Sequence, residues 1–372
     1  MKRLRFFTLY VVFQLAYQLY SQTPRNDAVI NHRPDYQASI AGRVVDASNG
    51  AGLPNVNVFL DGTTLGVASD KDGFFVIRNV PRGAYELVVS MVGYERQVVK
   101  LEVFEDKNYE LTVNLKPIAI EIGTVEVTAK DPVEWKKNFE EFRKKFLGET
   151  KNAEACVIQN PEVLNFRTNG DLLEIAYHVP LFVENRALGY RIEFLLEQFR
   201  SDGVMLQYSA KTRFEDIQPT GEDEYRQWQE NRKRAYAGSC KHFLTALIKG
   251  TSYEEGFRVQ SVPSLRLRTN FHRSLDLAKL VHDTRYGFQK KLSFADFLEI
   301  TYLLEPAEPA FQFAVNAQGR TLSRQVSWLQ MNRLTVLIDA NGNILEPFSL
   351  KKAGYWAFER IADLLPTDYV PE

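Results

Sequence analysis

The chain has 372 residues, of which 45% are hydrophobic, and it carries 46 Lys and Arg against 47 Asp and Glu. This composition is typical of a folded globular protein of two or three domains and excludes a largely disordered chain. The net charge of -1 gives no general attraction for nucleic acid or an anionic membrane, and 2 Cys with 5 dispersed His argue against a multi-cysteine zinc site or a disulfide-dense scaffold.

The first residues have the layout of a secretory signal peptide. Basic residues among the first five precede a mostly apolar run of 14 residues at 6–19, and a polar stretch begins at Ser21. The run is shorter than the roughly 20 residues that cross a bilayer. We therefore expect a signal peptide at 1–21, a flexible lead-in at 22–37, and an exported mature chain in the periplasm or associated with the outer membrane, without an integral membrane span. An uncleaved anchor stays open as the alternative.

The two cysteines would meet an oxidising environment in an exported protein. Cys156 lies in an apolar stretch, and Cys240 falls on the apolar side of a predicted helix. These positions are typical of buried free thiols. A disulfide between Cys156 and Cys240 stays open, since the sequence does not give their separation.

Residues 38–116 have the pattern of an all-β sandwich. Short β-branched and aromatic runs are separated by Gly, Pro, Asn and Asp, which favours antiparallel strands joined by turns. The predicted strands are 40–45, 56–60, 74–77, 85–90, 97–103 and 109–115.

The stretch IAGRVVDASNGAGLPNVNVFLDGTTLGVASDKDGFFVIRNVPRGAYELVVSMVGYE resembles the carboxypeptidase regulatory-like domain. That resemblance implies a transthyretin-like (prealbumin-like) sandwich of seven strands, common in exported proteins of Bacteroidota. We interpret the matching residues as structural: Asp72-Gly73 suits a tight turn, and Asp70 can bond to its backbone. Asp70 and Asp72 lack the other oxygen ligands of a calcium loop, so we expect no metal. The matching residues are Gly42, Asp46, Pro54, Gly66, Asp70, Asp72, Gly73, Phe75, Gly83, Tyr85, Gly93 and Tyr94.

A linker strand and an amphipathic helix are predicted at 117–149. IGTVEVTAK at 122–130 resembles the strand that follows this domain in outer-membrane TonB-dependent transporters, but the rest of the chain has no plug signature and too few strands for their barrel of roughly 22. The helix carries aromatic residues at helical spacing, which favours packing on its own domain and leaves partner docking open. These residues are Trp135, Phe139, Phe142 and Phe146.

Residues 150–372 predict an α+β domain with an antiparallel sheet. We expect a hairpin that turns at Asn169-Gly170, one long helix at 222–249, and a last hairpin that turns at Asn341-Gly342. This half resembles a family of exported Bacteroidota proteins of unassigned function. The resemblance rests on FLGETKNAEACVIQNPEVLNF, ENRALGYRIEFLLEQF, WQENRKRAYAGSCKHFLTAL and YWAFERIADLLPTDYVPE.

The sequence predicts no catalytic site and no cofactor. No His is followed three residues later by Glu, so the zinc motif of carboxypeptidases is absent; His32 with Asp35 comes nearest, in the lead-in. Ser239, Cys240 and His242 are the nearest approach to a nucleophile with a base, but Cys240 and His242 point to different faces of a helix. The remaining histidines are His178, expected to be exposed, and His272 and His282, for which pH sensing or a shared metal stays open.

The leading interpretation is a non-enzymatic exported envelope protein, an interaction or accessory module related to outer-membrane transport. The expected partner is a TonB-dependent transporter or another envelope protein, bound through strand addition at an edge of the sandwich. A carbohydrate-binding protein whose partner is a glycan is one alternative. A hydrolase within 150–372 is the other, and no nucleic acid is expected.

Overall fold

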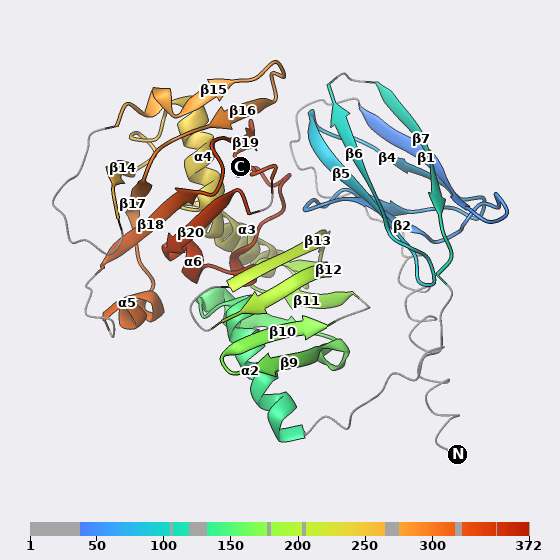
Figure 1. Cartoon of the computed structure of the whole chain (residues 1–372), viewed down its shortest axis with the longest axis horizontal. Helices are drawn as coiled ribbons and strands as arrows, with labels where there is room; N and C mark the ends of the chain where they lie inside the picture. Colours follow the sequence, from blue (N-terminus) through green and yellow to red (C-terminus); the bar gives the residue numbers. More distant parts are fainter. Residues whose placement is uncertain are drawn as a thin grey trace.

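The computed structural model describes residues 38–104, 107–118, 132–176, 180–202, 206–264, 275–316, 322–346 and 348–371. A β-rich N-terminal region that resembles transthyretin-like domains is followed by mixed sheets and helices, which form a second body beside it (Figure 1). The expected signal peptide, the lead-in and the IGTVEVTAK strand lie outside the described residues. Within the described parts of the chain, no helix has the length and apolar character needed to cross a membrane.

The N-terminal region is a sandwich of two sheets. One sheet has the order β4-β1-β7 and the other β3-β2-β5-β6. The six predicted strands are confirmed, and the sequence pattern misses β3 because its three residues are too few to show alternation. The strands are β1 (Ser39–Asp46), β2 (Asn57–Leu60), β3 (Gly66–Ala68), β4 (Phe74–Ile77), β5 (Gly83–Ser90), β6 (Gln97–Val103) and β7 (Asn108–Leu115).

Alternation along these strands places one face of each sheet in a shared core. Ile40, Val58, Leu87, Val89 and Leu115 are fully buried there. Each such side chain stabilises the fold by about 1.5–3 kcal/mol relative to an exposed position. The sandwich therefore has a hydrophobic core of its own.

A six-stranded sheet forms the centre of the second body. Its order is β8-β11-β12-β10-β9, and β13 pairs with β12 over most of their length. The hairpin predicted at Asn169-Gly170 is confirmed, since β9 and β10 pair antiparallel around it. The strands are β8 (Cys156–Ile158), β9 (Asn165–Asn169), β10 (Leu172–Ala176), β11 (Leu181–Asn185), β12 (Tyr190–Ser201) and β13 (Leu206–Asp216).

Helix α2 (Pro132–Leu147) packs on one face of this sheet. Phe142 and Phe146 are fully buried, and their rings meet Phe199 and Phe194 edge-on, with centroids 4.9 and 5.1 Å apart. The aromatic stripe therefore packs on its own domain. This helix, predicted as part of a linker region at 117–149, belongs to the core of the second body.

The single helix predicted at 222–249 is wrong: the structure has α3 (Glu222–Tyr236) and α4 (Cys240–Lys249). Gly238, with φ of 75°, ends the first helix. Ser239 then starts the second, because its side-chain oxygen accepts a hydrogen bond from the His242 N–H at 3.1 Å. Periodicity of apolar residues continues across so short a break and does not reveal it.

Two smaller sheets complete the second body, with orders β14-β17-β18-β20 and β15-β16-β19. The last predicted hairpin is confirmed at its turn, where the Asp339 N–H donates to the Asn343 carbonyl at 2.9 Å and the Leu345 N–H to the Leu337 carbonyl at 3.0 Å. The second strand predicted at 344–350 is wrong, since β20 begins only at Leu350 and pairs with β18. The strand before the turn pairs with β16 along its other edge, so the local turn and the sheet form together. The elements are β14 (Phe257–Val262), β15 (Val281–Asp283), β16 (Gln289–Leu292), β17 (Phe297–Pro306), α5 (Pro309–Asn316), β18 (Arg324–Met331), β19 (Val336–Asp339), β20 (Leu350–Gly354) and α6 (Tyr355–Phe358).

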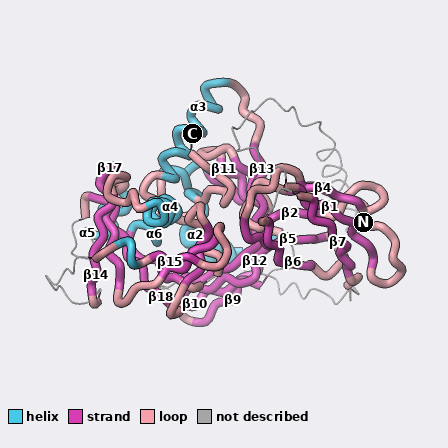
Figure 2. The backbone as a smooth tube through the Cα atoms, turned by 90° about the horizontal axis from the view of Figure 1, so that it is seen from above, coloured by secondary structure: helices cyan, strands magenta, loops and turns pink. Residues whose placement is uncertain are grey.

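The sandwich packs beside β12 and β13 of the six-stranded sheet (Figure 2). Leu195 of β12 alternates with the α2-facing residues and packs instead against Phe59 and Val88 of the sandwich. Beside this apolar contact, Lys211 pairs with Asp61 at 3.2 Å and also with Glu86. The sheet thus lies between α2 and the sandwich.

The turn between β2 and β3 also joins the edge of β13. The Gly62 N–H donates to the Thr212 carbonyl at 2.8 Å, and the Gly62 carbonyl accepts from the Thr367 N–H at 2.7 Å. The Asp368 carboxylate accepts from the Thr64 hydroxyl at 2.7 Å. We call residues 61–64, 212–214 and 366–369 the three-way junction, since they tie the sandwich, the sheet and the chain end together.

Candidate functional site

In the acidic turn of the sandwich motif, the Asp70 carboxylate is hydrogen-bonded to the backbone of the turn itself. Asp70 Oδ1 accepts hydrogen bonds from the N–H groups of Asp72 and Phe74 at 2.9 and 2.8 Å. Gly73 has φ of 86° and lies against the Val44 carbonyl, where a side chain would collide. Among the described residues, no three His, Cys, Asp or Glu side chains gather in a way that suits a metal.

Asp46 and Tyr94 connect the start and the end of the motif. The Tyr94 hydroxyl donates to Asp46 Oδ2 at 2.8 Å, and Asp46 Oδ1 accepts from the Ser48 hydroxyl and N–H. The Ser48 bonds lower the pKa of Asp46. The Tyr85 hydroxyl donates to the Pro81 carbonyl at 2.9 Å. Of the other motif residues, Gly42 lies against the Phe75 ring, Gly66 against Phe59 and Gly83 against Tyr85, while Pro54 and Gly93 lie in turns.

Ser239, Cys240 and His242 have structural partners and do not pair a nucleophile with a base. His242 Nδ1 accepts from the Gly238 N–H at 3.0 Å, so its proton is on Nε2, which donates to Glu255 at 2.8 Å. Burial lowers the pKa of His242 and raises that of the Cys240 thiol to about 11. Ser239 is the cap of α4, as described above.

The other candidate histidine and cysteine residues that the structure describes lie far from one another. His282 is exposed on β15, with Nε2 3.2 Å from the Ser293 hydroxyl. Both cysteines are free thiols: Cys156 packs in the core under α2 and Cys240 against the core around α4, so the disulfide left open by the sequence is not formed. Burial raises the pKa of Cys156 to about 12. His32, Asp35, His178 and His272 lie outside the described residues.

A group of buried carboxylates lies where the end of the chain meets the start of the six-stranded sheet. Asp363 accepts hydrogen bonds from Thr150 Oγ1 at 2.8 Å and Asn152 Nδ2 at 2.9 Å. Burial raises the pKa of Asp363 to about 6, and it also raises the pKa of Glu308 and Glu359. This group can bind a proton in mild acid. Spacing in the sequence does not reveal it, because Glu308 is about fifty residues from Glu359 and Asp363, and the partners Thr150 and Asn152 are farther still.

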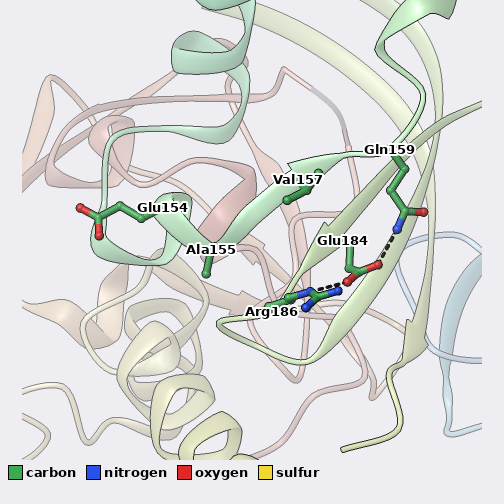
Figure 3. A pocket seen from close by; sticks show the side chains of 6 residues that line it. All are labelled: Glu154, Ala155, Val157, Gln159, Glu184 and Arg186. Atoms are coloured by element: carbon green, nitrogen blue, oxygen red, sulfur yellow. Dashed lines mark hydrogen bonds and ion pairs between the residues drawn. The ribbon is translucent and has the colours of Figure 1, made fainter.

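A shallow cavity of about 360 Å³ lies beside β8 (Figure 3). Glu184 points toward Gln159 and Arg186 and accepts a hydrogen bond from each. These polar groups therefore bind one another, whereas a ligand site usually directs its polar groups into the cavity. Its lining residues are Glu154, Ala155, Val157, Gln159, Glu184 and Arg186.

The aromatic cluster at the boundary of the two bodies has a different geometry from a sugar-binding platform. Phe104 is 39% exposed, and its ring centroid lies 5.5 Å from that of Tyr286 and 5.2 Å from that of Phe288. The rings pack on one another instead of presenting a flat row. They join the sandwich to the β15–β16 hairpin.

On one side of the sandwich, β6 and β7 lie at the edges of opposite sheets. Within the described residues, each is the terminal strand of its sheet. Val99, Leu101, Tyr109 and Leu111 pack against the core but are only partly buried there. We call these two strands with their partly exposed core residues the seam.

The hydrogen bonds of the neighbouring strands show which backbone groups of β6 face outward. The Asp61 N–H donates to the Glu86 carbonyl at 2.9 Å, so the backbone groups of Glu86 face β2. Glu86 is paired with Lys100 across β5 and β6. Because backbone groups alternate in direction along an antiparallel strand, the N–H and C=O of Lys100 point away from β5. Those of Val98 and Glu102 do the same, since they lie two residues away.

Comparisons with known proteins bear on the sandwich. Residues 40–127 match the CarboxypepD_reg-like domain family. The resemblance seen in the sequence is thereby confirmed for this domain. No curated protein matches the chain significantly.

Several solved structures share a distant likeness with the chain. A cohesin–X-dockerin complex from Acetivibrio cellulolyticus is 20% identical, and the match spans 20% of this chain and about half, 52%, of that one, with a TM-score of 0.18. A 5-hydroxyisourate hydrolase from Klebsiella pneumoniae is 17% identical over 22% of this chain and 91% of its own, with a TM-score of 0.19. A proposed carbohydrate binding protein from Bacteroides uniformis is 12% identical over 48% and 79%, with a TM-score of 0.19.

Proposed function

We propose that this chain is a non-enzymatic exported envelope protein that binds another envelope protein by adding a partner's strand at the seam. The observation that carries this proposal is the outward direction of the backbone groups of Val98, Lys100 and Glu102, on an edge that no strand of the described residues pairs with. Unpaired edge groups are a ready template for a further strand. An added strand would also cover the partly exposed Val99 and Leu101.

The favoured partner is an outer-membrane TonB-dependent transporter. The CarboxypepD_reg-like domain and the IGTVEVTAK segment both resemble parts of such transporters. The contacts with β12, β13 and the three-way junction hold the sandwich from the β2 and β5 side. This attachment leaves the side chains of Val98, Lys100 and Glu102 on β6 exposed. A partner can therefore bind at the seam while the sandwich stays attached to the second body.

The test is affinity purification of the tagged full chain from gently solubilised, crosslinked native envelope, with two variants at one position. Lys100→Pro removes an outward N–H but none of the bonds to β5, whereas Lys100→Ala keeps that N–H. We expect wild type and Lys100→Ala to enrich the same protein and Lys100→Pro to lose most of it, with unchanged circular dichroism. Equal capture by Lys100→Pro, or no reproducible capture by wild type, would contradict the proposal.

A further inference from the structure

We infer that the β6 edge of a second copy of this chain is an occupant of the seam, paired antiparallel and symmetrically around Leu101. The inference rests on the proposed function, since it uses the same outward backbone groups. It starts from the order of side chains from Val98 to Phe104, which is self-complementary when the strand is reversed.

A two-fold pair centred on Leu101 brings complementary residues together. Lys100 lies opposite Glu102 of the second copy, and Glu102 opposite its Lys100, so two ion pairs form across the strands. Both residues have outward N–H and C=O groups, so each of these pairs can exchange two backbone hydrogen bonds. The centre of the interface is then Leu101 against its own copy.

The same register covers the apolar part of the seam. Val99 lies opposite Val103 of the second copy, on the core side of the sheet, where Val99 and Leu101 are only partly buried. On the outer side, Val98 and Phe104, each 39% exposed, come opposite one another at both ends. Each copy therefore covers exposed apolar groups of the other.

Charge selects this register over its neighbours. A pair centred on Lys100 would place two ammonium groups opposite each other, and one centred on Glu102 would place two carboxylates together. Like charges directly opposite each other destabilise a strand pair, and opposite charges stabilise it. Lys100 and Glu102 are exposed, and neither has an ion pair within the described residues, so both are available to a second copy.

The test is sedimentation equilibrium of the full mature chain with a charge swap. Wild type is expected to dimerise in a concentration-dependent way. Lys100→Glu and Glu102→Lys each place like charges in both pairs and are expected to weaken dimerisation by about tenfold or more. The double variant Lys100→Glu/Glu102→Lys restores opposite charges and is expected to return to within about threefold of wild type. A monomer at every concentration, or a double variant as weak as the single ones, would overturn the inference.

Lys100→Pro separates this inference from the proposed function. If wild type is monomeric but Lys100→Pro still abolishes capture of an envelope protein, self-pairing is wrong and strand addition stands. If wild type dimerises and Lys100→Pro leaves the dimer intact, β6 is not the contact and the self-pairing is overturned. If neither dimerisation nor envelope capture responds to Lys100→Pro, both proposals are wrong.

Discussion

Asp363 is a buried side chain that makes the stability of this protein depend on pH. Burial raises its pKa from 3.8 to about 6, so the folded protein binds a proton at Asp363 more tightly than the unfolded chain does. The free energy of unfolding therefore falls as the pH rises from about 4 to about 6. Above that range Asp363 is ionised while buried, which lowers the free energy of unfolding.

Asp363→Asn should remove that cost. An asparagine can keep both contacts, accepting from Asn152 and donating to the Thr150 hydroxyl. We expect the variant to be more stable than wild type by about 2 kcal/mol at pH 7, with a smaller difference at pH 4. Urea unfolding followed by circular dichroism across this pH range measures the difference. Equal stability of the two proteins at pH 7 would show that Asp363 is not strained by burial.

Some side-chain hydrogen bonds could be predicted from the sequence and others could not. The turn at Asp70-Asp72-Gly73 could be predicted, because Asp70 bonds to backbone groups only two and four residues away. The contacts of Asp363 with Thr150 and Asn152 were not, because they join residues separated by about half the chain and depend on how the sheets fold.

At the scale of elements, α4 holds the end of the chain through Lys241. Its ammonium group donates to the carbonyls of Thr367 and Tyr369 at 2.8 and 2.9 Å and to that of Pro366 at 3.4 Å. Burial lowers the pKa of Lys241 to about 8, below the 10.5 of an exposed lysine. The unfolded chain therefore binds more protons between these values, so the free energy of unfolding rises with pH from 8 to 10.5.

Lys241→Met should release the end of the chain. The amide of Thr367, which donates to Gly62, is expected to exchange its hydrogen at least about tenfold faster, because three carbonyls lose a charged donor. The rise in stability between pH 8 and 10.5 should disappear. Lys249→Met, at an exposed position of the same helix, is the matched control. Unchanged exchange at Thr367 would mean that Lys241 does not hold the chain end.

Helix α2 is the element whose assignment matters most for dissecting the protein. Phe146 is fully buried against the six-stranded sheet, so Phe146→Ala is expected to cost about 3–5 kcal/mol in urea unfolding. Val133→Ala, at a position that is 77% exposed, should cost far less. If Phe146→Ala is as stable as wild type, α2 is an appendage, as the domain boundary expected at 149 and 150 implies.

Elements were predictable where the partner strand is the nearest one. The turn at Asn169-Gly170 joins β9 to β10, whereas the turn at Asn341-Gly342 joins β19 to a short paired segment at 343–345, and the next strand, β20, pairs with β18. Both turns contain Asn-Gly and both form, so the Asn-Gly signal predicts the turn but not the length of the strand that follows it. The break at Gly238 was likewise hidden, because apolar spacing continues on both sides.

At the scale of the whole molecule, the sandwich and the second body are one assembly. The contact of Phe59, Val88 and Leu195, the ion pairs of Lys211, and the three-way junction all join the two bodies. None of these contacts could be predicted from the sequence, which indicates two consecutive domains but not how they pack on each other. Their consequence for function is that the face of the sandwich around Phe59 and Val88 is fixed against the second body, while Val98, Lys100 and Glu102 of β6 stay exposed.

The most direct test of the seam is residue-resolved hydrogen exchange of β6 in the free chain and in the complex purified from crosslinked native envelope. The amides of Val98, Lys100 and Glu102 should exchange readily in the free monomer and become protected in the complex, because a partner strand accepts from them. Those of Val99 and Leu101, already bonded to β5, should change little. A complex in which the three outward amides exchange as fast as in the free chain would contradict strand addition at the seam.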